Sequence, residues 1–214
     1  MTTPAPLGSR ARPADRLSDG QLRRAEVLEV AARLLAQDGP HGLSLRRVAA
    51  AAGGSTQLIY TLFGGKAGLA DALYAEGFQR LGAQMRAALC GPEAAGDPAR
   101  LLALGRGYRQ FARCEPSFFA VMFGRSIPGF SPARQTRLAG RDCTFGQVVN
   151  EVAACLAAGT LVAADGDAED LARIFWATAH GVAALEVAGL LAADDLEVFV
   201  ERTLRVPLTA HLPR

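Results

Sequence analysis

Apolar residues recur at helical spacing along almost the whole chain. Between residues 19 and 37, Leu28, Ala31, Ala32 and Leu35 follow one another at intervals of three and four, which is the period of one face of a helix. No segment keeps up the apolar and polar alternation that is typical of a half-buried strand. The pattern therefore predicts an all-α fold.

Clusters of Gly and Pro divide this pattern into about nine helices. The predicted helices cover residues 19–37, 45–52, 55–63, 66–89, 99–114, 117–123, 133–158, 168–191 and 194–210. We expect Ser18 or Asp19 to cap the first helix and Ser44 to cap the second. Loops are predicted at residues 127–132 and, with acidic capping character, at 165–167.

Three regions follow from this division. Residues 1–17 are rich in Pro and Arg and lack an apolar segment, which predicts a disordered arm and neither a secretory signal nor an anchor. Residues 18–66 form a three-helix head, and residues 67–214 form a larger helical body. No apolar run reaches the ~20 residues that cross a membrane, so no membrane partner is expected.

Residues 44–63 fit a helix-turn-helix, in which two short helices cross steeply around a tight turn. Ala49 is the small residue at the predicted contact, and Gly53 occupies the turn, where a missing Cβ permits positive φ. The apolar positions expected to face the core are Leu45, Val48, Ala52, Ile59 and Leu62. A three-helix helix-turn-helix domain is therefore predicted at the N-terminus.

The polar face of the second of these helices favours DNA as the partner. Thr56 and Gln57 lie at its N-terminus, the part that usually meets base edges in the major groove, and Gln can bind adenine through two hydrogen bonds. Ser55 is expected to cap the helix and to reach a phosphate. The full set of predicted DNA-contacting residues is Ser44, Arg46, Arg47, Ser55, Thr56, Gln57, Tyr60, Thr61 and Lys66. The alternative is a helical hairpin whose polar face only meets water.

Charge is distributed unevenly along the chain. Residues 1–70 contain nine Lys or Arg and five Asp or Glu, whereas the remainder contains 14 and 16, although the whole chain has a formal net charge of only +2. A basic head on a slightly acidic body suits a polyanionic partner for the head alone. A nonspecific DNA-binding or adaptor protein, the second alternative, would be more basic throughout.

Residues 22–78, and in particular the block LSLRRVAAAAGGSTQLIYTLFGGKAGL, resemble the DNA-binding domain of the TetR/AcrR family of repressors. The resemblance lies in Ser44-Leu45-Arg46 through Ala52-Gly53, in Ile59 to Phe63 and in Gly65-Lys66. It implies that Tyr60 and Lys66 contact phosphates and that Thr56 and Gln57 face bases. The chain departs from the family pattern at Gly54, where Val or Ile is usual, and this should loosen the turn slightly.

The body resembles one subgroup of the same family. The similarity covers residues 104–130, together with Trp176, His180 and Gly181, which fit the Trp-His-Gly signature that names the subgroup. The resemblance implies that the body binds a small-molecule effector, whose identity the sequence does not give. The protein is thus expected to be a ligand-responsive repressor that binds a palindromic operator.

Aromatic and sulfur-containing side chains of the body are the candidates for the effector pocket. The predicted lining consists of Tyr108, Phe111, Phe119, Met122, Phe123, Phe145, Trp176 and His180. For most of these residues a place in the core is the alternative. His180 is the most informative polar candidate, because its ring could bind a ligand or simply be a satisfied core residue.

Helix 168–191 is apolar on two faces, so it must be covered on both sides. One face carries Leu171, Ile174, Phe175, Thr178, Val182 and Leu185, and the other carries Trp176, Ala183, Val187 and Leu190. With helix 194–210 it predicts a four-helix interface of a homodimer. The alternative is a monomer that encloses this helix completely.

An enzyme is disfavoured, because the chain has no nucleophile elbow, P-loop, zinc-protease motif or dinucleotide fingerprint. The histidines His41, His180 and His211 are scattered, so neither a metal nor a cofactor is expected. Cys90, Cys114, Cys143 and Cys155 lack metal-binding spacing. Without an export signal, they predict reduced thiols in a cytoplasmic protein.

Overall fold

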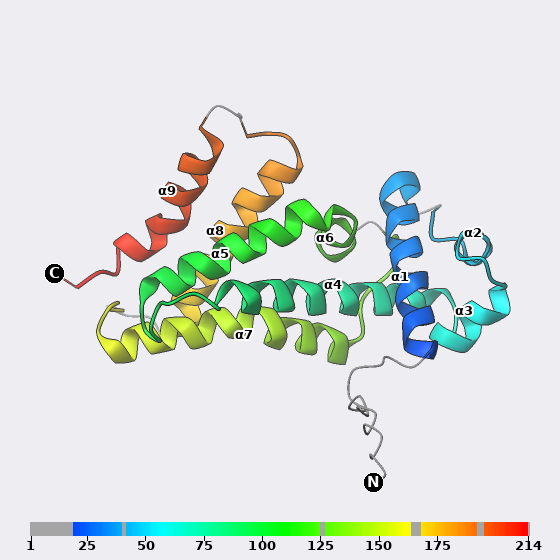
Figure 1. Ribbon diagram of the computed structural model, residues 1–214, viewed down its shortest axis with the longest axis horizontal. Coiled ribbons are helices and arrows are strands. Elements are labelled where there is room, and N and C mark those ends of the chain that lie inside the picture. The colour runs from blue at the N-terminus through cyan, green and yellow to red at the C-terminus, as the bar shows by residue number, and fades with distance from the viewer. Residues whose placement is uncertain (1–18, 40–41, 125–126, 164–167, 192–194, 214) are drawn as a thin grey trace, which may run out of the picture.

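The chain folds into helices joined by short loops, with no strand in the part that the structure describes (Figure 1). The computed structural model describes residues 19–39, 42–124, 127–163, 168–191 and 195–213. The helices of these residues are α1 (Asp19–Asp38), α2 (Leu45–Ala51), α3 (Thr56–Phe63), α4 (Lys66–Ala88), α5 (Pro98–Cys114), α6 (Pro116–Phe123), α7 (Arg134–Ala158), α8 (Ala168–Val187) and α9 (Leu196–Thr209). The predicted all-α fold with nine helices is confirmed for the described part. None of these helices is long and apolar enough to cross a bilayer.

Helices α1, α2 and α3 form the head at one end of the molecule (Figure 1). Val48 and Ala49 of α2 are buried, as is Ile59 of α3, so the small and apolar positions meet as predicted. Gly53 has φ of 63°, which a residue without Cβ adopts at little cost. The head is thus the predicted helix-turn-helix domain.

Helix α4 runs from the head through the body and packs on both (Figure 1). It contacts α1 and α3 in the head, and α5, α6 and α7 in the body. A Cβ on Gly77 would lie 2.5 Å from Sδ of Met122 on α6, and one on Gly82 would lie 2.5 Å from the carbonyl oxygen of Cys143 on α7. These two glycines therefore allow α6 and α7 to approach α4 closely.

A single arginine of α4 joins the head to the body. Nη2 of Arg80 lies 2.5 Å from Oε1 of Glu29 on α1, and its Nη1 lies 3.5 Å from Oε2 of Glu115, which precedes α6. The guanidinium also stacks on the buried ring of Phe118 on α6, at 4.3 Å from its centroid. We call this cluster the Arg80 joint. Helices α1 and α6 also contact each other directly, so a shift of α6 or α4 would also displace residues of the head.

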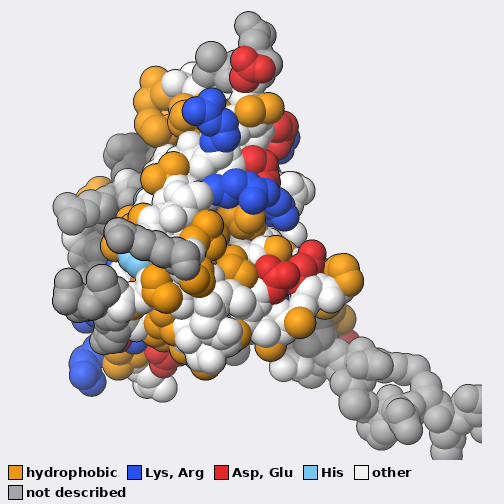
Figure 2. Space-filling view, turned by 90° about the vertical axis from the view of Figure 1, so that its left-hand side faces the viewer, with side chains coloured by type: hydrophobic (Ala, Val, Ile, Leu, Met, Phe, Trp, Pro, Cys, Tyr) orange, Lys and Arg blue, Asp and Glu red, His pale blue; other side chains and the backbone are white. Residues whose placement is uncertain are grey.

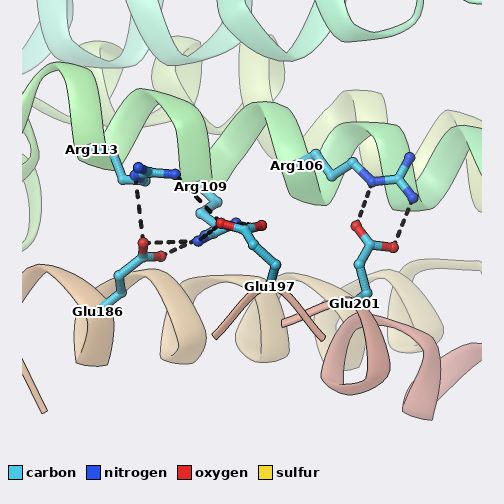
Figure 3. A network of polar contacts seen from close by, with 6 residues as sticks. All are labelled: Arg106, Arg109, Arg113, Glu186, Glu197 and Glu201. Atoms are coloured by element: carbon cyan, nitrogen blue, oxygen red, sulfur yellow. Dashed lines mark hydrogen bonds and ion pairs between the residues drawn. The ribbon is translucent and has the colours of Figure 1, made fainter. Parts of the chain in front are cut away.

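Ion pairs attach the C-terminal helices to α5 (Figure 3). Arg109 makes two hydrogen bonds to Glu186 of α8, of 2.6 and 2.9 Å, and two to Glu197 of α9, of 2.6 and 2.8 Å. Arg106 is bound in the same two-bond manner to Glu201 of α9. Hydrogen bonds from Arg109 hold the pKa of Glu197 below its usual value. The α8–α9 hairpin is therefore fixed to the body from one side.

Helix α8 is shorter than predicted and ends at Val187 instead of residue 191. Gly189, with φ of 69°, reverses the chain, and the amide of Leu190 donates to the carbonyl of Leu185 at 2.9 Å. Such a left-handed glycine with a backward hydrogen bond ends many helices. The predicted start of the last helix at Asp194, the arm at 1–17, Ser18, His41 and the turn at 165–167 lie outside the described residues.

The division of α8 into two apolar faces needs correction. The buried face consists of Leu171, Ala172, Phe175, Ala179, Val182 and Ala183, whereas Ile174 and Leu185, predicted to share a face with Leu171, are exposed. Ala183, predicted on the opposite face, is buried. The body thus covers one face and leaves a stripe from Ile174 to Leu185 uncovered in the single chain.

We expect the ion pairs of Arg109 and Arg106 on α5 to differ in their effect on stability. The side chains of Arg109 and Glu186 are only 10% and 12% exposed, whereas those of Arg106 and Glu201 are 51% and 33% exposed. Arg109→Met should lower the free energy of unfolding by about 3 kcal/mol, because it leaves the carboxylate of Glu186 buried with only Arg113 nearby. Arg106→Met should cost less than about 1 kcal/mol.

Urea unfolding of the two variants measures this difference, and the double variant Arg109→Met/Glu186→Gln should recover part of the loss. Equal effects of Arg109→Met and Arg106→Met would show that burial does not set the strength of these pairs.

Candidate DNA-binding face and effector pocket

Helix α3 is anchored by its inner face and by its first residue. Ile59 is buried completely and Phe63 nearly so, which fixes the rotation of the helix about its axis. Ser55 occupies the N-cap, and its Oγ accepts a long hydrogen bond of 3.4 Å from the amide of Leu58. Gly64, with φ of 72°, ends the helix. Because the buried inner face fixes the rotation of α3, it also determines which side chains point outward.

The outward side chains of α3 are those that the sequence predicted to meet DNA. Thr56, Gln57, Tyr60 and Thr61 are all exposed, and 55% of Tyr60 is accessible although it is a large aromatic residue. The hydroxyl of Thr61 donates to the carbonyl of Gln57 at 3.0 Å, so only its acceptor capacity remains for an external partner. The structure thus brings four of the predicted residues together on one polar face.

The predicted DNA-contacting residues that flank α3 differ in their exposure and in their contacts within the chain. Arg46 and Lys66 are exposed, and the ring of Tyr60 packs near Gly65, directly before Lys66. Arg47 is exposed but pairs with Asp38 of α1 at 2.5 Å, which competes with a phosphate for its charge. Ser44 is the N-cap residue of α2, as predicted, but its half-buried side chain makes no capping hydrogen bond.

The departure at Gly54 has a structural counterpart on α1. A Cβ at Gly54 would lie 2.7 Å from Cδ2 of Leu58 and 3.3 Å from Nη2 of Arg23. The same Nη2 donates a hydrogen bond of 2.6 Å to the carbonyl of Ala52, at the end of α2. Arg23 therefore braces the turn from the side that a larger residue at position 54 would occupy. Sequence reasoning missed this contact because the two positions are 29 residues apart along the chain.

Most of the predicted pocket aromatics lie in the core of the body. Tyr108, Phe111 and Phe119 are buried, and the hydroxyl of Tyr108 lies 2.7 Å from Nδ1 of His180 in a hydrogen bond. The rings of Phe119 and Phe123 pack on His180 as well. Burial among these rings lowers the pKa of His180 below its ordinary value of 6.5, which keeps the imidazole neutral near pH 7.

Two neighbouring pockets open along α4 and α7, and both are lined by Tyr74 and Arg137. The first has a volume of about 320 Å³, and its lining comprises Tyr74, Phe78, Phe123, Arg137, Arg141, Thr144, Phe145, Arg173 and Trp176. The second, of about 670 Å³, lies under residues 127–132 and includes Val121 and Met122 of α6. We call the first the aromatic pocket. Its size is in the range of small-molecule sites.

Four of the eight predicted pocket residues line these spaces. Phe123, Phe145 and Trp176 line the aromatic pocket and Met122 lines its neighbour, whereas Tyr108, Phe111, Phe119 and His180 line neither. The sequence reasoning missed the arginines. Their signal was the spacing of Arg137, Arg141 and Phe145 at intervals of four, which places them on one face of α7.

An exposed polar recognition face on a helix-turn-helix head, carried by a helical body with a pocket, defines a helix-turn-helix transcription regulator. Comparisons with known proteins give the family. Residues 27–73 match the model of bacterial regulatory proteins of the TetR family, and residues 101–206 match that of the tetracycline repressor-like C-terminal domain. The chain belongs to the TetR family of transcriptional regulators. The resemblance to the Trp-His-Gly subgroup stays a prediction.

Solved structures share the fold over nearly their full lengths. A protein of unknown function from Rhodococcus sp. RHA1 is 31% identical, with a TM-score of 0.75 over 94% of this chain and 98% of that one. The TetR family transcriptional regulator PfmR from Thermus thermophilus is 22% identical, with a TM-score of 0.64 over 88% and 99%. The superantigen PfiT is 23% identical, with a TM-score of 0.68 over 91% and 98%. The search of curated proteins gives no match.

The lowered pKa of His180 predicts a pH-dependent stability. Because the folded protein binds this proton less readily than the unfolded chain, stability is fully present above pH 6.5 and falls as the pH drops below that value. His180→Gln should flatten the dependence of the unfolding free energy on pH below about pH 6.5. Urea unfolding at several pH values measures it, with His211→Gln as the control. An unchanged slope in His180→Gln would contradict the assignment.

Proposed function

We propose that this protein is a ligand-responsive repressor, and that a homodimer binds a palindromic operator through α3. The observation that carries the proposal is the polar face of Thr56, Gln57 and Tyr60, which is exposed on a helix whose inner face is buried. Such a helix fits the major groove, where side-chain amides and hydroxyls read base edges. No catalytic role is proposed for any residue of this face, and the site of action is expected to be the cytoplasm.

Contacts with the DNA divide into two kinds in this proposal. Gln57 and Thr56 read bases, whereas Tyr60, Lys66 and Arg46 bind phosphates and set the position of α3 in the groove. At the edges of this face the Ser55 hydroxyl can donate a hydrogen bond and the Thr61 hydroxyl can accept one, and Ser44 and Arg47 have secondary roles. The Arg47–Asp38 pair would have to open before Arg47 meets a phosphate.

The dimer interface in this proposal combines the stripe that the body leaves uncovered on α8 with the exposed apolar residues of the following turn and of α9. Exposed large apolar residues gather on the C-terminal helices and the turn between them: Ile174, Leu185, Val187, Leu190, Val198, Phe199 and Val206. Figure 2 looks onto the end of the molecule at which α9 lies, and hydrophobic side chains reach the surface there between charged ones. A Cβ on Gly181 would meet nothing within 4 Å, so α8 offers a flat, small surface beside Leu185. An apolar surface of this kind commonly marks an interface.

The aromatic pocket is the candidate effector site. Its walls come from α4, α6, α7 and α8, and two of these helices meet at the Arg80 joint. A ligand that separates Phe123 of α6 from Phe78 of α4 would move the partners of Arg80 and, through Glu29, the head. Such coupling requires that the ligand favour one arrangement of the head over the other. Release from the operator would follow from the altered distance between the two heads of a dimer.

Operator binding is tested with a duplex that the protein selects from a randomised library. Fluorescence anisotropy should show tight binding that survives excess random DNA. Gln57→Ala should weaken binding to the selected duplex by about 10- to 100-fold and relax the preference at one base pair. Lys66→Gln should weaken binding to all sequences and reduce the salt slope by about one.

The matched control for this experiment is Gln84→Ala, which removes an exposed amide from α4. Its affinity should equal that of the unaltered protein. If no sequence is enriched from the library, or if Gln57→Ala binds as Gln84→Ala does, α3 is not the reading helix.

Dimerisation is tested by placing a charge in the proposed interface. Leu185→Glu should weaken self-association by at least about 100-fold, because each charge would lose its water without gaining a partner. Leu138→Glu on α7 is the control, since Leu138 and Leu185 are 43% and 44% exposed. Sedimentation equilibrium measures both. A Leu185→Glu protein that still sediments as a dimer would place the interface elsewhere.

A further inference from the structure

The aromatic pocket has a chemical bias that its shape alone does not give. Five aromatic side chains line it, from α4, α6, α7 and α8, and three arginines, Arg137, Arg141 and Arg173, stand among them. None of its lining residues is an Asp or Glu. A pocket with apolar walls and positive charge alone favours ligands that combine a flat apolar part with a negative group.

The three arginines differ in how far their charges are already neutralised. Arg173 binds Glu169 at 2.6 Å and also pairs with Asp170, and Arg141 shares the same Glu169 carboxylate. Arg137 donates only a weak hydrogen bond, of 3.4 Å, to the carbonyl of Pro132. It takes part in none of the ion pairs between described residues. Arg137 therefore has the guanidinium that is open to an external anion.

The position of Arg137 fits this role. It lines both the aromatic pocket and its neighbour, so its charge stands where the two spaces meet. Tyr74 lines both as well, and burial raises the pKa of its phenol, against the opposing effect of the Arg137 charge. A neutral Tyr74 hydroxyl remains able to donate a hydrogen bond to the same anion.

The aromatic walls favour a ring as the apolar part of the ligand. The ring of Trp176 meets that of Phe145 edge to face at a centroid distance of 6.0 Å, and the rings of Tyr74 and Phe78 are tilted at 4.8 Å. Aromatic side chains arranged in this way attract a further ring through edge and offset contacts. The guanidinium fork of Arg137 in turn matches the two oxygens of a carboxylate.

We propose that the effector of this protein is an aromatic carboxylate, with its ring against Trp176 and Phe145 and its carboxylate on Arg137. The regulatory role of this ligand rests on the proposed function, but its binding to the pocket does not require DNA. Arg137 would repel a cationic ligand. A neutral ring of the same shape would lose the Arg137 contact and bind more weakly.

The chain carries its own reporter for this site. Trp176 is the single tryptophan of the chain and lines the aromatic pocket, so its emission reports on the surroundings of this pocket. Biphenyl-4-carboxylate and its neutral analogue biphenyl-4-carboxamide are suitable probes. Both are added to the full chain in the absence of DNA, with emission and titration calorimetry as readouts.

We expect the carboxylate to change the emission of Trp176 and to bind at least about tenfold more tightly than the carboxamide. Arg137→Gln should remove this preference and leave the affinity for the carboxamide unchanged. Arg134→Gln, which removes an exposed arginine of the same helix that does not line the pocket, should bind both probes as the unaltered chain does.

Equal affinities for the two probes, an Arg137→Gln variant that keeps the preference, or binding without a change in Trp176 emission would each overturn the inference. The outcome is separable from that of the operator experiment. Loss of operator binding would refute the proposed regulator while leaving the carboxylate site intact. A failed carboxylate titration would leave operator binding untouched.

Discussion

Helix α4 is packed in both the head and the body, and the rest of the structure depends on this shared packing. Its first turns pack against α1 and α3, and its later turns are enclosed by α5, α6 and α7. A helix held this tightly moves as a rigid rod, because packed interiors yield little to small displacements. A displacement of α4 in the body would therefore also move its turns in the head, and the Arg80 joint would add a second route through α6 and α1.

The arginines of the body differ in whether a carboxylate of the described residues pairs with them. On α5, Arg106 and Arg109 hold α8 and α9 in place through paired carboxylates. On α7, Arg137 has no such partner among the described residues and faces a pocket with aromatic walls. The same type of side chain thus stabilises the fold where a carboxylate meets it, and we propose that it binds a ligand where none does.

Much of the fold could be predicted from the sequence because its signals are local. The period of Leu28, Ala31 and Leu35, and the glycine at position 53, depend on neighbours within a turn or two. The end of α8 had such a signal too, in Gly189, but the prediction of a helix up to residue 191 did not use it. The buried face of α8 was harder to predict, because it depends on which residues far away in the chain pack against the helix.

The site residues, too, could be predicted where the signal was local and not where it depended on distant parts of the chain. Outward residues of α3 could be named because a short amphipathic helix has only one polar face, which the buried Ile59 confirms. The pocket was predicted only in part, as aromatic side chains serve equally well as core and as lining. Its arginines lie on α7 and α8, and only the folded chain brings them to the aromatic residues of α4. The Arg23 contact with Ala52 is of the same long-range kind.

The two close approaches of α4 constrain evolution differently. At Gly77 the obstacle is the side chain of Met122, so a shorter residue at 122 would make room for alanine at 77. At Gly82 the obstacle is the carbonyl oxygen of Cys143, which no side-chain exchange removes. Descendants of this protein could therefore exchange positions 77 and 122 together as a pair, whereas position 82 has no compensating partner and is left with glycine alone.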